Sequence, residues 1–151
     1  MIYIDTSAIV KLYIKEPDSR DVSKWIKKNN EPIPYTRLTE MELINALKLK
    51  EFRKEIHTDD FDKICLKLQE HEERGVYYRP PIDWPVIYTL ALDLSKAHTS
   101  NIGSRSLDIL HVAAALFLKA DRILTFDERQ AQLAAIAGIN VINRNLDRKW
   151  F

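Results

Sequence analysis

The stretch Met1-Ile-Tyr-Ile-Asp5-Thr-Ser7 opens the chain with a short apolar run that ends in a carboxylate and two hydroxyl side chains. We expect a strand over residues 1–5 and a helix over residues 6–14. Residues 122–126 and 139–142 are further short apolar segments and are expected to be strands. Short apolar strands are typical of a parallel sheet that is covered on both faces. Strands that alternate with helices predict an α/β fold with a short parallel sheet flanked by helices.

Apolar periodicity and capping residues predict six further helices, at residues 17–28, 39–54, 58–75, 83–98, 107–119 and 128–137. The start of the third helix is placed at Thr39, because Thr39 and Glu42 have the spacing of a capping box. A short strand is expected at residues 33–36, where Pro34 weakens the pattern. Residues 99–106 are expected to form a polar loop.

The length and composition are those of a soluble globular domain. The chain has 151 residues, 46% apolar and 30% charged, with a formal net charge of +1. We expect a single domain over residues 1–142, followed by a C-terminal tail at residues 143–151. No apolar segment is long enough to span a membrane, and the N-terminus lacks the pattern of a secretory leader, so a cytoplasmic location is expected.

Composition excludes several kinds of site. One cysteine, Cys65, excludes an intrachain disulfide and a cysteine-based zinc cluster. Three glycines, none in a phosphate-binding pattern, exclude a dinucleotide turn and a Walker-type loop. The near-neutral charge excludes a general basic field, so any contact with nucleic acid has to be local.

Four carboxylates border apolar segments and are the candidate functional residues: Asp5, Glu42, Asp108 and Asp127. Asp5 and Asp127 follow two of the expected strands, and the carboxyl ends of parallel strands meet at one edge of the sheet. Asp108 lies at the start of a helix that is apolar on almost every side. Gathered acids repel one another, so a bound cation is expected among them.

Each acid also has a structural explanation. Asp5 and Asp127 both precede an expected helix and could be its N-cap. Glu42 could be the capping-box partner of Thr39, and Glu40 lies on the same helix at an equally suitable spacing. Asp108 gains a little from the helix dipole as a first-turn acid. Together, the four positions favour a metal site with oxygen ligands, which suits Mg²⁺ or Mn²⁺ and the hydrolysis of phosphodiester bonds.

Four segments resemble the PIN-domain family, and within it the VapC-type toxins. They are Tyr3-Ile-Asp5-Thr-Ser-Ala-Ile-Val-Lys-Leu-Tyr13, Glu42-Leu-Ile-Asn45-Ala-Leu, Ser106-Leu-Asp108-Ile-Leu-His111-Val-Ala-Ala-Ala and Leu124-Thr-Phe-Asp127. They occur in the family's order and spacing over residues 1 to about 142.

The resemblance implies a three-layer α/β/α domain whose acids bind magnesium or manganese and cleave RNA. It implies catalytic and metal-binding roles for Asp5, Asp108 and Asp127, and it selects Glu42 over Glu40. Supporting roles for hydroxyl groups are implied for Thr6, Ser7, Ser104 and Thr125. The expected partners are an RNA substrate, a protein antitoxin and a second copy of the chain.

Three other functions fit parts of the pattern. The fold could serve a DNA nuclease or an RNA-processing enzyme outside a toxin pair. A phosphatase with an aspartate nucleophile usually has Asp-x-Asp, which Asp5-Thr6-Ser7 lacks. A non-catalytic RNA- or protein-binding module would use the acids only as helix caps.

Overall fold

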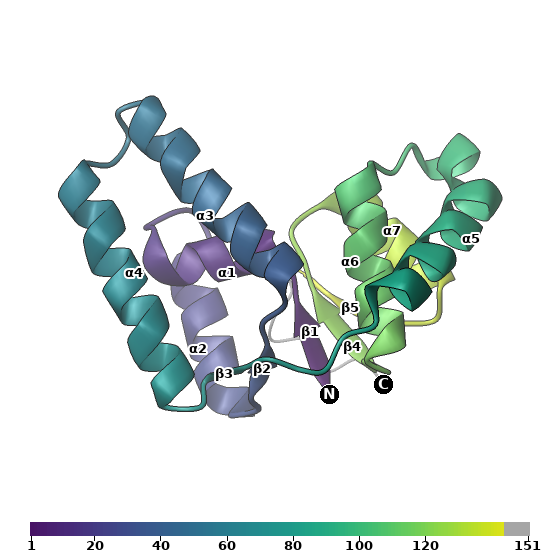
Figure 1. The fold of residues 1–151 in the computed structure, drawn as a ribbon, viewed down its shortest axis with the longest axis horizontal. Coiled ribbons are helices and arrows are strands. Elements are labelled where there is room, and N and C mark those ends of the chain that lie inside the picture. The colour runs from purple at the N-terminus through teal and green to yellow at the C-terminus, as the bar shows by residue number, and fades with distance from the viewer. Residues whose placement is uncertain (144–151) are drawn as a thin grey trace. The chain divides into compact units, whose positions relative to one another are not determined.

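The computed structural model describes residues 1–143 and divides into two compact units (Figure 1). The first unit is formed by Met1–Ala8 together with the chain from Pro81 onwards, and the second by Ile9–Pro80. The prediction of one domain over residues 1–142 stays a prediction. The expected tail lies, apart from Asn143, outside the described residues.

A three-stranded parallel sheet forms the centre of the first unit. Its order is β1 (Ile2–Ile4), β4 (Arg122–Leu124) and β5 (Asn140–Ile142). In its middle row Tyr3 pairs with Ile123, and Ile123 pairs with Val141. All three strands run in the same direction, so the residues that follow them reach one common edge.

Three helices complete the first unit: α5 (Trp84–Ile102), α6 (Ser106–Phe117) and α7 (Glu128–Ile136). Helix α6 is buried at every position from Asp108 to Ala115, as its all-round apolar sequence predicts. It packs against both α5 and α7. Asp108, in the first turn of α6, is therefore buried together with the apolar residues that follow it.

The predicted polar loop at residues 99–106 is wrong in its first half. Helix α5 continues to Ile102, and Thr99 Oγ1 donates a hydrogen bond to Ser95 Oγ at 3.3 Å within it. The helix ends where Gly103 adopts a φ of 74°, a left-handed conformation that glycine takes without strain. Three residues, 103–105, then lead into α6, so the turn before Asp108 is short.

The second unit is mainly helical. Helix α1 (Thr6–Tyr13) begins in the first unit and continues into the second, which also holds α2 (Ser19–Asn29), α3 (Arg37–Phe52) and α4 (Thr58–Glu73). Helices α3 and α4 pack on each other (Figure 1). Two short parallel strands, β2 (Ile33–Pro34) and β3 (Tyr77–Tyr78), pair beside them. The sequence did not predict β3, and β2 is shorter than the expected 33–36.

The predicted start of α3 is also wrong. The N-cap is Thr36, whose Oγ1 accepts a hydrogen bond from the backbone N–H of Thr39 at 3.2 Å. Thr39 is instead the third residue of the helix, and its own hydroxyl lies 3.1 Å from that of Thr36. The capping-box explanation of Glu42 therefore fails.

Among the described residues, no helix is long and apolar enough to cross a membrane.

Candidate functional site

Asp5 lies directly after β1 and is 4% exposed. Its backbone N–H donates to the carbonyl of Leu124 at 3.0 Å, which continues the pairing of β1 with β4. Its Oδ2 accepts hydrogen bonds from Ser7 Oγ at 2.6 Å and from Thr125 Oγ1 at 3.0 Å. Two hydroxyl groups named by the resemblance thus fix the direction of this carboxylate.

The same hydroxyls connect Asp5 with the segment that carries Asp127. The backbone N–H of Phe126 donates to Ser7 Oγ at 3.0 Å, and that of Asp127 donates to Thr125 Oγ1 at 3.1 Å. Asp127 is the N-cap of α7, because its Oδ1 accepts from the N–H of Gln130 at 2.9 Å. The cap role uses Oδ1 and leaves Oδ2 for another partner.

Asp108 is joined to Asp127 by an arginine. The Arg105 Nε donates to Asp108 Oδ2 at 3.0 Å, and an Arg105 Nη2 hydrogen donates to Asp127 Oδ2 at 3.0 Å. Asp108 Oδ2 also faces the backbone N–H of Arg105 at 3.4 Å, at the start of α6. Asp5, Asp127 and Asp108 therefore belong to one connected hydrogen-bond network in the first unit.

The positive charge in this network does not fully offset the cost of placing its carboxylates together. Burial raises the pKa of Asp108, the hydrogen bond from Arg105 opposes this, and the negative charge of Asp127 raises the pKa further. The hydrogen bond to Asp108 and the charges of both acids raise the pKa of Arg105. One guanidinium therefore does not offset the cost of placing these acids together, and a site of this kind favours additional positive charge.

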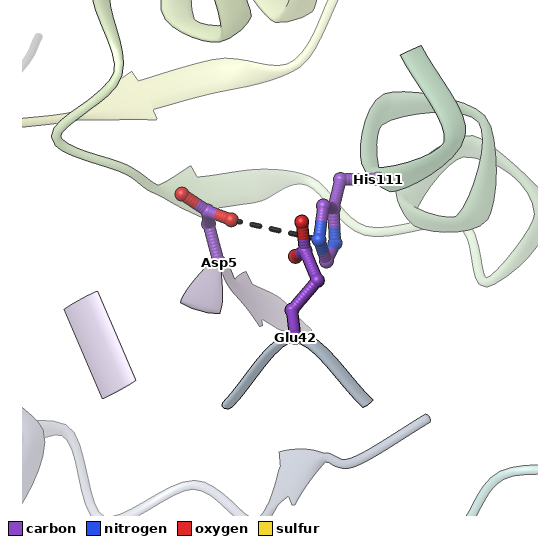
Figure 2. Close-up of side chains that lie close together, drawn as sticks. All are labelled: Asp5, Glu42 and His111. Atoms are coloured by element: carbon purple, nitrogen blue, oxygen red, sulfur yellow. Dashed lines mark ion pairs between the residues drawn. The ribbon is translucent and has the colours of Figure 1, made fainter. Parts of the chain in front are cut away.

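His111 lies one turn beyond Asp108 on α6 and is 1% exposed. Its Nδ1 lies 2.8 Å from the hydroxyl of Tyr3, and its Nε2 lies 3.7 Å from Asp5 Oδ1. Figure 2 shows the imidazole beside the Asp5 carboxylate, with the ion pair drawn as a dashed line. When Tyr3 donates to Nδ1, the remaining N–H of the neutral ring is on Nε2, on the side of Asp5.

Two other residues named by the resemblance are buried in the first unit. Thr6 is the first residue of α1, next to Asp5 in the chain. Ser104 is 7% exposed, and its Oγ has no hydrogen-bond partner among the described residues. A buried hydroxyl of this kind usually meets a water or a ligand.

Glu42 lies on α3, in the second unit. It is one of the three residues labelled in Figure 2. Its competitor Glu40 has a structural role. The guanidinium of Arg79 binds both carboxylate oxygens of Glu40 at 3.0 Å, and Arg37 adds a contact at 2.8 Å. Glu40 is thus used in ion pairs within the second unit, which does not favour it as a metal ligand.

The donor set of the network fits a hard divalent cation. Asp5, Asp108 and Asp127 offer carboxylate oxygens, which are the ligands that Mg²⁺ and Mn²⁺ prefer, and Ser7 and Thr125 orient the carboxylate of Asp5. Arg105 already places a positive charge across two of these acids. Carboxylates that are linked at the carboxyl edge of a parallel sheet, two of them through one guanidinium, are the kind of oxygen donors that metal-dependent hydrolases use.

Comparisons with known proteins give the family. The model of the PIN domain family matches residues 2–136, so the chain belongs to this family. The predicted α/β/α fold class with a short parallel sheet is thereby confirmed. No curated protein sequence is similar enough to this chain to count as a match.

A solved structure supports the fold. The chain is similar to the crystal structure of FitAcB from Neisseria gonorrhoeae, with a TM-score of 0.65 and 18% sequence identity. The similarity covers 95% of this chain and 97% of that one.

The sequence analysis missed Arg105 and the contact of Tyr3 with His111. Arg105 stands three residues before Asp108, so its place next to the start of α6 was visible in the spacing, and the structure shows it as the N-cap residue. No signal in the sequence connects it with Asp127, which is 22 positions away. Tyr3 was predicted only as part of the strand over residues 1–5, and the structure places it fully buried in β1.

Proposed function

We propose that this chain is a metal-dependent endoribonuclease that hydrolyses RNA phosphodiester bonds, and that it acts as the toxin of a toxin–antitoxin pair. The proposal is supported by membership of the PIN domain family. The observation that carries it is the network of Asp5, Asp108 and Asp127 at the carboxyl edge of the parallel sheet. The likeness of four segments to VapC-type toxins supports the choice of RNA and of the toxin role.

The proposed metal site is formed by Asp5, Asp108 and Asp127, with Glu42 from α3 as the fourth acid. A bound Mg²⁺ or Mn²⁺ would make a water more acidic and neutralise charge on a phosphate. Ser7 and Thr125 hold the Asp5 carboxylate in one orientation, so that its oxygens do not have to be ordered when the substrate arrives. Thr6 and the buried Ser104 hydroxyl are proposed to bind water or substrate beside the acids.

A protein antitoxin and a second copy of the chain are the proposed partners. The resemblance supports both, and the second unit carries exposed apolar side chains that suit a protein contact. Met41, Leu49 and Phe52 are 54%, 41% and 83% exposed and lie on one side of α3 by their spacing. The proposed location is the cytoplasm.

Asp5→Asn, Asp108→Asn and Asp127→Asn test the proposal. Each purified variant and the wild type are incubated with RNA and with DNA, with MgCl₂, MnCl₂ or EDTA. We expect the wild type to cut RNA only with metal. Each variant should lose at least about 100-fold in rate, more than the loss of a supporting hydrogen bond near a metal gives.

Asp93→Asn is the matched control, because Asp93 is an exposed acid on α5 outside the network. It should cut RNA at the wild-type rate. Cleavage of DNA alone would replace the proposed substrate with DNA. Full activity of a folded Asp5→Asn or Asp108→Asn protein would refute the site assignment.

A further inference from the structure

Arg105 lies across two of the acids with a side chain that is 69% exposed. Its Nε binds Asp108 and its Nη2 group binds Asp127, each at 3.0 Å. The Asp108 carboxylate is much less accessible, with 10% of its side chain exposed. The exposed guanidinium of Arg105 thus places its positive charge next to the buried carboxylate of Asp108.

At Asp127, Arg105 uses the oxygen that the helix cap leaves for a metal ion. At Asp127 the other oxygen, Oδ1, already caps α7 through the N–H of Gln130 at 2.9 Å. Asp127 Oδ2 therefore remains for a cation, and Arg105 occupies it. At Asp108 both contacts of Arg105, through its Nε and its backbone N–H, go to Oδ2.

An exposed ion pair is weak enough to be exchanged. Contacts of this type contribute little in water, so a divalent ion at the same oxygens can displace the guanidinium. Asp108 is buried and shares one guanidinium with Asp127, so the two carboxylates favour a more highly charged cation. Once released, a guanidinium binds phosphate oxygens well, because its planar donors match their geometry.

We propose that Arg105 is a built-in counter-cation, which holds Asp108 and Asp127 in the metal-free protein and transfers to a substrate phosphate when the metal ion takes its place. This inference rests on the proposed function, because it needs the acids to be metal ligands. It adds a role for a residue outside the acidic set. Arg105 competes with the metal before the substrate arrives and binds the substrate afterwards.

The first test measures binding of Mn²⁺ alone by isothermal titration calorimetry, with no RNA present. Arg105→Gln removes the competing charge and keeps a shorter polar side chain with N–H donors. We expect it to bind Mn²⁺ about three- to tenfold more tightly than the wild type, the range set by losing two exposed ion pairs. Its metal-free form should also melt at a lower temperature than the wild type, because two carboxylates lose their partner.

Arg129→Gln is the control for the loss of one positive charge. Arg129 is exposed on the first turn of α7, and its Nη1 donates to the carbonyl of Gly103 at 3.3 Å. This variant should bind Mn²⁺ as the wild type does. If Arg105→Gln does not fold, Arg105→Lys keeps the charge without the forked geometry and should give a smaller increase in affinity.

The second test measures RNA cleavage at saturating Mn²⁺. Arg105→Gln should raise KM several-fold with little change in kcat, because it loses a phosphate contact. An unchanged KM would overturn the transfer to phosphate. Equal or weaker Mn²⁺ binding by Arg105→Gln, with clear binding by the wild type, would overturn the competition and leave the proposed function intact. Absence of Mn²⁺ binding by both proteins would overturn the proposed function and this inference together.

Discussion

Asp108 is a buried acid with one positive and one negative neighbour. Arg105 binds it at 3.0 Å, yet burial and the charge of Asp127 keep its pKa above the ordinary value of 3.8. In the folded protein at neutral pH, the charged form of Asp108 is therefore less favourable than it is in the unfolded chain.

Asp108→Asn should raise the melting temperature of the metal-free protein at pH 7 by a few degrees, about 1–4 °C. The amide keeps the shape and an acceptor oxygen but carries no charge. As the pH falls through the raised pKa, the wild-type carboxyl also becomes neutral, so the difference between the two proteins should shrink. Differential scanning calorimetry with EDTA, from about pH 8 to about pH 4, measures both effects. A lower melting temperature of the variant at pH 7 would mean that Asp108 is mainly a helix-start residue held by Arg105.

At the residue scale the sequence predicted where the strand-end acids lie, whereas their role as metal ligands stays a prediction. Parallel strands end at one edge, so Asp5 and Asp127 could be expected near each other without coordinates. Arg105 could not be expected there, because nothing in the sequence decides which acid an exposed arginine will bind. The acidic partners of Lys48 and Lys50 could not be predicted from the sequence either. They belong to a basic cluster on α3, but they form ion pairs with Glu51, Glu16 and Glu55.

At the scale of single elements, the polar ends of helices were harder to predict than their apolar faces. Helix α6 was expected at 107–119 and spans Ser106–Phe117, because its run of apolar residues leaves little choice. Helix α5 extends beyond its predicted end at residue 98 to Ile102. Polar residues such as Thr99 can continue a helix as readily as they start a loop. Strand β3 has only two residues and depends on its pairing with β2. No local sequence pattern predicts that pairing.

Thr36 rather than Thr39 should control the start of α3. Thr36→Val keeps the volume of this buried side chain but removes the oxygen that accepts from the N–H of Thr39. We expect a loss of about 1–2 kcal/mol in the free energy of unfolding, measured by urea denaturation.

Thr36→Ser provides the comparison, because it keeps the oxygen and loses only a methyl group. It should be clearly more stable than Thr36→Val. Equal stability of the two variants would show that the hydroxyl contributes nothing as a cap and that the side chain acts only through its volume.

At the scale of the whole molecule, the two units differ in that a carboxyl group with a raised pKa, that of Asp108, lies in the first unit. In the second unit, Arg79 lowers the pKa of Glu40 by hydrogen bonding. Burial alone would raise the pKa of Glu16, but Lys50 and Lys11 lower it. In the first unit the pKa of Asp108 is raised, whereas the N-terminal ammonium lowers that of Asp121.

Acid should therefore weaken the second unit more than the first. A lowered carboxyl pKa gives stability that is present above the unfolded value of about 4.3 and is lost as the pH falls through the folded pKa. The raised pKa of Asp108 works in the opposite direction, since protonation relieves a cost. Between pH 7 and about pH 3.5, the urea midpoint of the second unit should fall further than that of the first.

Tryptophan fluorescence can report each unit separately. Trp25 lies in the second unit and Trp84 in the first, so the double variants Trp84→Phe/Trp150→Phe and Trp25→Phe/Trp150→Phe leave one reporter in each. Coincident midpoints at every pH would contradict the expected difference. That result would support one cooperative domain, as the sequence predicts for residues 1–142.

The packing of α6 has a practical consequence for genetics. Ala113, Ala114 and Ala115 are fully buried on the helix that carries Asp108 and His111. A bulkier side chain at any of the three would push on the whole helix and shift both residues, with no chemical role of its own. Under the proposed toxin function, a selection for cells that survive expression of this protein should therefore recover alleles at these alanines, and survival alone would not mark a position as part of the active site.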